Sequence, residues 1–313
     1  MPDPSVERSL LEQLAQDLLT ERRRDRRWRI FFRFAALALV CLGLVAALAV
    51  VGSREHVCLD QCTALVEIRG ELEAGGRASA QRIVEGMQAA MKHRGIKGLI
   101  LRINSPGGSP VQAGQVHDEV LRLRSLHPEI PIHAVVEEAA ASGGYYIAVA
   151  ADRIYVDKAS LVGSIGVIMD GFGFTGTMEK LGVERRVLTA GQNKALMDPF
   201  SPADPKQRAY VQSMLDDIHG QFIAAVKAGR GTRLKETPEL FTGLIWNGQR
   251  AVELGLADAL GSVDSVAREV FKAEEILDFT PPDDLADRFA RRFGATFARE
   301  MLSLRQQVPG SLR

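Results

Sequence analysis

Three glycine-rich segments of the chain carry the side chains that could do nucleophilic chemistry. They are residues 104–109 (NSPGGS), residues 141–146 (ASGGYY) and residues 189–197 (TAGQNKALM). Each follows a strand-like apolar run, and open α/β folds place their sites at the ends of strands. We therefore expect a nucleophile, an oxyanion hole and a base among these segments.

Ser142, in the second segment, is the candidate nucleophile. It is predicted to open a helix, where the helix dipole and free N–H groups favour negative charge, although capping is the commoner role of such a serine. The glycines that follow favour catalysis, because they clear space for a substrate and leave the N–H of Gly143 free to face an oxyanion. Residues 104–109 are a second candidate oxyanion hole, with an ordinary tight turn as the alternative.

A nucleophilic serine needs a base, and the histidines do not supply one in a recognisable pattern. Of the six histidines, only His219 follows Ser142, in the middle of a predicted helix and without a motif around it. A lysine takes this role when burial lowers the pKa of its ammonium group. Lys194 stands between small and apolar neighbours, after the strand-like residues 185–188. Spacing alone does not separate it from a solvated surface lysine.

The N-terminal region predicts a membrane anchor. Residues 22–33 contain seven arginines and one aspartate, and residues 34–53 contain no acidic or basic side chain. At about 1.5 Å per residue, a helix of that length crosses a bilayer core. A cleaved signal peptide is the alternative, but its apolar region would be shorter and no clear A-x-A cleavage site follows. The arginines predict a cytoplasmic N-terminus, which leaves the chain beyond residue 54 outside the cytoplasmic membrane.

The composition excludes several classes of protein and of site. The 313 residues are 46% apolar and 25% charged, as in an ordinary globular protein, and 39 basic residues balance 39 acidic ones. An overall basic field for nucleic acid is therefore excluded. Cys41 lies in the predicted span, and Cys58 and Cys62 form either a short-loop disulfide or two stalk thiols. Together with His56 they lack a fourth ligand, so we expect no metal.

Beyond the predicted anchor, short apolar runs alternate with helical patterns, which predicts an α/β domain of crossover units. The strand candidates are residues 64–68, 98–103, 132–136, 153–156 and 166–169. After Pro202 the pattern is mostly helical, with an apolar stripe of Tyr210, Met214, Ile218 and Phe222. Residues 285–301 predict a further amphipathic helix, which by default packs on a neighbouring subunit or on the domain body.

These patterns divide the chain into four parts. We expect a cytoplasmic arginine-rich segment, a transmembrane helix, an extracytoplasmic domain and a C-terminal amphipathic helix or tail, at residues 1–33, 34–53, 54–280 and 281–313.

The motifs of the domain, taken in order, resemble those of the signal peptide peptidase A family, membrane-anchored Ser-Lys peptidases, in its short single-domain form. The resemblance covers residues 64–270 and is carried by INSPGG (103–108), ASGGYYIA (141–148), VGSIGVI (162–168), AGQNKALMDPF (190–200) and WNGQRAVELGLADALG (246–261). It implies an α/β fold like that of Clp protease and crotonase, built of repeated ββα units. It also implies a ring-shaped homo-oligomer in which serine and lysine meet at subunit boundaries.

The same resemblance implies a role for each residue of the site. Ser142 is the nucleophile, and Lys194, 52 positions later, is the general base. Ser164 hydrogen-bonds the lysine and orients it. Asn193 replaces the aromatic residue that often precedes the lysine, which affects the substrate preference.

For the oxyanion hole, the resemblance implies the N–H of Gly143 together with that of Gly107 or Gly108. The mechanism requires no cofactor and no metal. The implied substrates are peptides with small apolar side chains near the scissile bond. They include signal peptides left after secretion, cleaved at the outer face of the cytoplasmic membrane.

Three other functions remain as alternatives. Residues 171–176 match G-x-G-x-x-G, which would indicate a dinucleotide-binding oxidoreductase, but no acidic residue ends the next strand about 20 residues later. A non-catalytic membrane-anchored scaffold of the same fold is opposed by the presence of Ser142, Ser164 and Lys194 together. A crotonase-type acyl-CoA enzyme is opposed by the predicted location, where CoA is scarce.

Overall fold

The computed structural model describes residues 26–43 and 61–282, within two compact units that comprise residues 1–57 and 58–313. Residues 26–43 of the first unit form a helix, on which the rings of Trp28, Phe31 and Phe32 contact one another. The predicted span begins on this helix, and residues 44–53 lie outside the described part of the chain. None of the described helices has the length and apolar character needed to cross a membrane. The anchor and the four-part division therefore stay predictions.

The second unit contains one eight-stranded sheet, which confirms the predicted α/β class. The strands are β1 (Cys62–Arg69), β2 (Ile96–Ser105), β3 (Ile132–Ala141), β4 (Arg153–Val156), β5 (Leu161–Gly163), β6 (Ile245–Asn247), β7 (Ala259–Leu260) and β8 (Glu275–Asp278). Their order is β6-β5-β3-β2-β1-β8, with β4 paired to both β3 and β7. All neighbours run parallel except β5 and β6, which are antiparallel.

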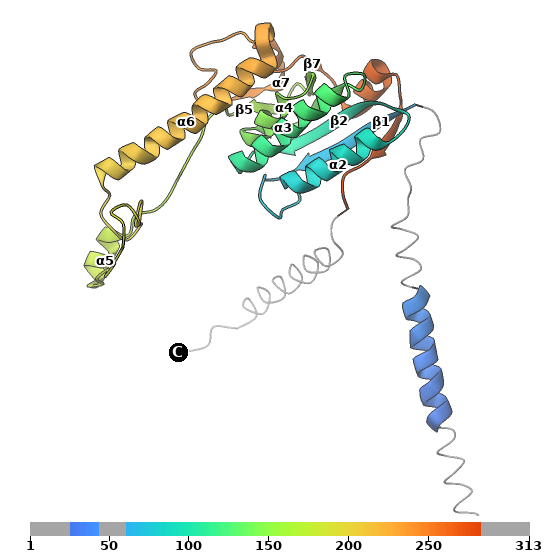
Figure 1. Cartoon of the computed structure of the whole chain (residues 1–313), viewed down its shortest axis with the longest axis horizontal. Coiled ribbons are helices and arrows are strands. Elements are labelled where there is room, and N and C mark those ends of the chain that lie inside the picture. The colour runs from blue at the N-terminus through green and yellow to red at the C-terminus, as the bar shows by residue number, and fades with distance from the viewer. Residues whose placement is uncertain (1–25, 44–60, 283–313) are drawn as a thin grey trace, which may run out of the picture. The chain divides into compact units, whose positions relative to one another are not determined.

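Three helices, α2 (Ala80–Lys92), α3 (Pro110–Leu126) and α4 (Gly143–Ala148), pack against one face of this sheet (Figure 1). The first four predicted apolar runs form β1 to β4. Ile83 and Met87 of α2 are buried in the main core, together with Val116 of α3, as the helical spacing predicts. Because α3 follows β2 and α4 follows β3, both helices begin at the carboxyl edge of the sheet.

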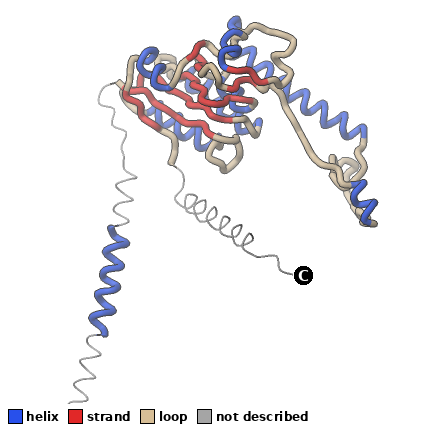
Figure 2. The backbone as a smooth tube through the Cα atoms, turned by 180° about the vertical axis from the view of Figure 1, so that it is seen from behind, coloured by secondary structure: helices blue, strands red, loops and turns tan. Residues whose placement is uncertain are grey.

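The opposite face of the sheet is covered only in part by the described residues. α8 (Val263–Ser265) and η2 (Val266–Phe271) form a short helical segment that packs on Ile100, Val135 and Tyr155. Seen from behind, the strands beside this segment lie open to the viewer (Figure 2).

Residues 166–204, between β5 and α6, leave the sheet, and we call them the arm. The arm carries α5 (Thr175–Leu181) at the outer end of the 26-residue helix α6 (Pro205–Arg230), far from the strands (Figures 1 and 2). Residues 166–169 and 185–188 were predicted as strands, and this prediction is wrong. The chain turns at Ser164, whose φ is 51°, and among the described residues the arm has no strand to pair with these apolar runs.

Many apolar side chains of the arm and of α6 are exposed. Leu188 is fully exposed, and the exposed fractions of Ile168 and Phe172 are 85% and 79%. In the predicted stripe of α6, Phe222 is buried, whereas Tyr210 and Met214 are exposed. The helix was therefore predicted correctly, but a single chain buries only part of its apolar stripe.

Two further predictions concern the ends of the domain. The amphipathic helix predicted at residues 285–301 lies outside the described residues, as does Cys58. Cys62, the first residue of β1, is buried and disulfide-bonded, so the interpretation as two free stalk thiols is wrong.

Candidate active site

Ser142 lies where β3 ends and α4 begins, in a backbone conformation that few residues adopt. Its φ is 50° and its ψ is −122°, and such regions cost about 1–3 kcal/mol for a residue other than glycine. The Ser142 N–H donates to Gly163 O at 2.9 Å, and the Ser142 carbonyl accepts from Tyr146 N–H at 2.9 Å. The Ser142 hydroxyl makes no capping bond to α4. The capping interpretation is therefore wrong, and Oγ remains available as a nucleophile.

Glycines allow the backbone to approach Ser142 from two sides. A Cβ at Gly143 would lie 2.9 Å from Leu72 Cδ1 and 3.3 Å from Ala113 Cβ, so a larger residue would have to displace the buried Leu72 side chain. A Cβ at Gly107 would lie 2.7 Å from Ser142 Cβ, and the φ of Gly107 is 111°. The glycines of both predicted segments are therefore needed to bring the β2 turn and the α4 start together.

The backbone around these glycines distinguishes Gly108 from Gly107 as a donor to an oxyanion. The Gly107 N–H already donates to Ser105 Oγ at 3.2 Å. Leu72 and Gly108 form a parallel bridge, in which Leu72 N–H donates to Gly107 O and Leu72 O accepts from Ser109 N–H. This bridge directs the Gly108 N–H away from Leu72.

The N–H groups of Gly108 and Gly143 are both without a hydrogen-bond partner in the described part of the chain. Gly143 is the first residue of α4, and the first N–H groups of a helix have no acceptor within it. The Cβ position of Gly143 is 3.5 Å from Gly108 N, so the two segments are in contact. The geometry therefore favours Gly108 over Gly107 as the second donor.

Ser164 is the counterpart of Ser142 on the neighbouring strand. Ala141 and Gly163 are partners in the parallel β3–β5 ladder, and each is followed directly by one of these serines. The φ of Ser164 is 51°, almost the same as that of Ser142, and its N–H donates to Leu244 O at 2.8 Å. Both serines line the same cavity, so the structure brings these two predicted site residues together.

The cavity beside Ser142 has a volume of about 560 Å³ and mostly apolar walls. Its lining also includes Gly108, Gly143 and Ser164, and its apolar side chains come from Pro106, Pro110, Ala113, Tyr146, Val167, Ile168, Ile218 and Phe222. The rings of Tyr146 and Phe222 are 5.1 Å apart. Burial, with the nearby Asp118, raises the pKa of Tyr146, so its phenol stays neutral. The site therefore combines a free hydroxyl and two N–H donors with an apolar cleft.

Lys194, the predicted base, is not part of this cavity in a single chain. It is exposed on the arm, where its N–H donates to Gly191 O at 3.2 Å. Asp198 holds the same segment, because it accepts from Ser201 Oγ at 2.6 Å and pairs with Arg185 at 3.2 Å. The Ser201 hydrogen bond is the main reason why the pKa of Asp198 lies below its ordinary value. The lysine is thus held on the arm, apart from Ser142.

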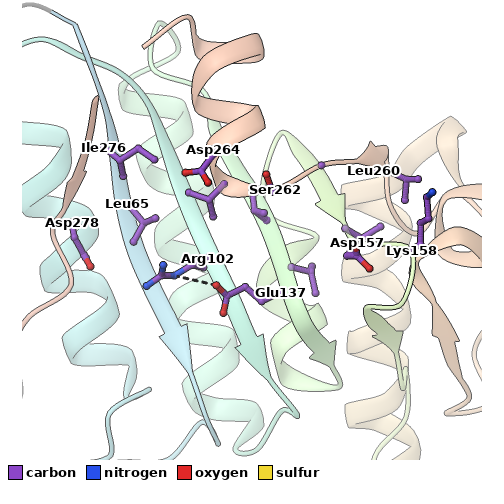
Figure 3. A pocket seen from close by; sticks show the side chains of 15 residues that line it. Leu65, Arg102, Glu137, Asp157, Lys158, Leu260, Ser262, Asp264, Ile276 and Asp278 are labelled. Atoms are coloured by element: carbon purple, nitrogen blue, oxygen red, sulfur yellow. Dashed lines mark ion pairs between the residues drawn. The ribbon is translucent and has the colours of Figure 1, made fainter. Parts of the chain in front are cut away.

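A second cavity, of about 590 Å³, lies on the opposite face of the sheet (Figure 3). Its lining includes Arg102, which pairs with Glu67 at 3.0 Å and lies 3.7 Å from Glu137. Its serine, Ser262, accepts from Ser265 N–H in the capping box of α8. The described lining of this cavity offers no free hydroxyl beside N–H donors, so the Ser142 cavity is the candidate active site.

Two further candidates from the sequence lie outside the lining of the Ser142 cavity. Residues 171–176 lie in the arm, and no strand directly precedes them because β5 ends at Gly163. They therefore lack the strand-turn-helix context of a dinucleotide site. His219, which had no motif around it, donates from Nε2 to Ile165 O at 3.1 Å, directly after Ser164. No local pattern could have revealed this contact, because it joins residues 54 positions apart.

The family model described as peptidase family S49 matches residues 124–276, which include Ser142, Ser164 and Lys194.

Curated relatives cover about two thirds of this chain. It is 32% identical over 199 residues to "Putative protease slr0021" of Synechocystis, across 64% of this chain and 69% of that protein. It is 30% identical over 200 residues to "Putative signal peptide peptidase SppA" of Enterococcus faecium, across 64% of this chain and 58% of that protein. It is also 38% identical over 212 residues to "Na(+)/H(+) antiporter NhaA" of Brucella melitensis, across 66% of this chain. The matched part is only 29% of that antiporter.

Proposed function

The chain belongs to peptidase family S49, and on that premise we propose that it is a serine peptidase with Ser142 as its nucleophile. The observation that carries this proposal is the free Ser142 hydroxyl, which lines an apolar cavity beside the N–H groups of Gly108 and Gly143. A nucleophile next to preorganised N–H donors is the arrangement that acyl transfer requires.

The proposed mechanism is acyl transfer through Ser142 with Lys194 as the base. Ser142 Oγ attacks the carbonyl carbon of the scissile peptide bond, and its proton passes to the neutral Nζ of Lys194. The carbonyl oxygen becomes an oxyanion, which accepts from the N–H groups of Gly143 and Gly108, each donor contributing about 2.7–4 kcal/mol. The lysine then protonates the leaving amine. The same lysine next deprotonates a water molecule, which attacks the acyl group and releases Ser142.

Lys194 serves the Ser142 of another copy of the chain in this proposal. Three features support it: the lysine is exposed, the arm holds it away from the cavity of its own chain, and the arm exposes apolar side chains such as Phe172 and Leu188. Exposed apolar side chains gathered on one segment are typical of a surface that another protein or a membrane covers. Packing of arms in a closed homo-oligomer, such as the ring that the resemblance implies, would cover these side chains and bury the lysine.

The substrates in this proposal are peptides with small apolar side chains next to the scissile bond. The apolar walls that Ile218, Val167 and Phe222 contribute to the cavity support this preference. With the N-terminus in the cytoplasm and the peptidase domain outside, the enzyme would meet peptides at the outer face of the membrane, including the remnants of signal peptides. The ion transport named for the Brucella relative is not part of the proposal, because the shared segment is a minor part of that protein.

Co-expression of two inactive variants tests whether Ser142 is the nucleophile and whether Lys194 acts on the Ser142 of another chain. The full chain is produced in detergent as wild type, as Ser142→Ala, as Lys194→Ala, and with both variants co-expressed. The assay is cleavage of a fluorogenic peptide with small apolar residues. We expect each variant alone to lose cleavage, and the co-expressed pair to regain part of it, because a Ser142 from one chain then meets a Lys194 from another.

Lys180→Ala is the matched control, because Lys180 is an exposed lysine on α5 of the same arm. It should keep the wild-type rate. Cleavage by Ser142→Ala would refute the nucleophile. An inactive co-expressed pair, with an active wild type, would refute the sharing of lysines between chains.

A further inference from the structure

We propose that His219 is a positioning residue for the catalytic site: its Nε2–H holds the turn that carries Ser164, and thereby fixes Ser164 for the lysine. The inference rests on the proposed peptidase function. It assigns a role to a residue of α6 that neither lines the cavity nor belongs to a recognised motif.

Three hydrogen bonds hold the turn from Ser164 to Gly166. One closes the turn, and the other two join it to other segments of the chain. Ser164 N–H donates to Leu244 O at 2.8 Å, and Gly166 N–H donates back to Ser164 O at 2.9 Å, which closes a three-residue turn. The carbonyl of Ile165 points out of this turn and accepts from His219 Nε2 at 3.1 Å. Because a carbonyl can only accept, Nε2 must carry the proton.

This bond matters because the turn is strained and the residue at its centre is buried. The φ of Ser164 lies in a region that serine rarely adopts, and such a conformation persists only when its surroundings hold it. Ile165 is completely buried, so its carbonyl would be costly to leave without a partner. His219 supplies that partner from a different element of the fold.

The same helix connects the other parts of the proposed site. One residue before His219, Ile218 forms a wall of the cavity, and Phe222 follows one turn later. The N-terminal end of α6 continues from the arm that carries Lys194. The His219–Ile165 bond therefore joins α6 directly to the Ser164 turn, beside the ring contact of Phe222 with Tyr146.

A pair of amide substitutions tests this role. In His219→Gln the amide nitrogen reaches the position of Nε2 and can donate to Ile165 O, whereas in His219→Asn it cannot. We expect His219→Asn to lower kcat about tenfold, the effect of one hydrogen bond, with KM within about twofold, because substrate contacts remain. His219→Gln should recover most of the wild-type kcat. His127→Asn is the matched control and should cleave like wild type, because the half-buried His127 lies at the end of α3 and outside the lining of the cavity.

The outcomes separate this inference from the proposed function. Wild-type kcat in His219→Asn would overturn the positioning role. Equal loss of kcat in both variants would also overturn it, because the imidazole would then be needed for its own chemistry. Should wild type itself not cleave, the proposed function fails, and hydrogen exchange of the Gly166 N–H still tests the contact. That exchange should be faster in His219→Asn than in His219→Gln, and equal rates would overturn the inference.

Discussion

Replacement of Gly107 by alanine would place a methyl group directly against the nucleophile. The new Cβ would lie 2.7 Å from Ser142 Cβ, 2.9 Å from Gly143 N and 3.0 Å from Ala141 O. Two of these neighbours are backbone atoms, so no side-chain rotation can relieve the contact. An ordinary van der Waals separation begins at 3.4 Å, so the β2 turn and the α4 start must move apart by roughly 0.7 Å.

The cost of this change has a conformational part and a packing part. Alanine at a φ of 111° is strained by about 1–3 kcal/mol, and overpacking adds about 1–3 kcal/mol. We therefore expect a loss of unfolding free energy of about 2–6 kcal/mol. The activity should fall further than the fraction folded, because a displacement of about 1 Å between reacting groups costs on the order of 100-fold in rate.

Gly114→Ala is the matched control for Gly107→Ala. Gly114 lies in α3 with open space around its Cβ position, so alanine should stabilise the helix by about 0.5–1 kcal/mol and leave cleavage unchanged. The assay measures kcat/KM and the midpoint of denaturant unfolding for both variants, at a temperature where both are folded. A folded Gly107→Ala variant that cleaves within twofold of wild type would refute the close approach as the reason for this glycine.

Two further predictions concern stability. Burial lowers the pKa of His133 from 6.5 to about 4, so the unfolded chain takes up the proton first as the pH falls. The contribution of His133 to the free energy of unfolding, at most about 3 kcal/mol, is present above pH 6.5 and is lost between about pH 6.5 and 4. A pH series of denaturant unfolding should show this loss for wild type but not for His133→Phe. Arg230→Met should cost about 3 kcal/mol, the lower end of the range for a broken buried pair, because Asp258 loses its buried 2.8 Å partner and keeps only Arg233, at 3.0 Å, as a balancing charge. Burial raises the pKa of Asp258, but the hydrogen bond and charge of Arg230 outweigh it and lower that pKa. The double variant with Asp258→Asn should unfold less readily than Arg230→Met, and equal stability of the two would show that the weakened charge pairing of Asp258 is not the cause.

Features that depend on neighbouring residues in the chain were predicted well. The apolar runs of β1 to β4 and the glycines next to Ser142 carry their own local signal, since burial on both faces of a sheet and close backbone approach each select residue types directly. The order of the motifs then added Ser164, which no local pattern singled out as a partner of Ser142.

Features that depend on distant residues were predicted less well. Residues 166–169 have the composition of a strand, but the turn at Ser164 sends them into the arm, where no strand pairs with them. The contact of His219 with Ile165 and the choice between Gly107 and Gly108 depend on hydrogen bonds to other segments, which a sequence pattern does not encode. The separation of Lys194 from Ser142 depends on the path of the whole arm.

The position of Lys194 on the arm has a consequence for when the chain is active. If each site needs a serine and a lysine from different copies, cleavage depends on mass action as well as on folding. A newly made chain that has not met another would be harmless to neighbouring polypeptides, with no propeptide or inhibitor required. At low expression the rate would rise more steeply than in proportion to the number of chains, and confinement of the chains to a membrane plane would raise their encounter rate. The arm would thus make proteolysis a response to local enzyme density.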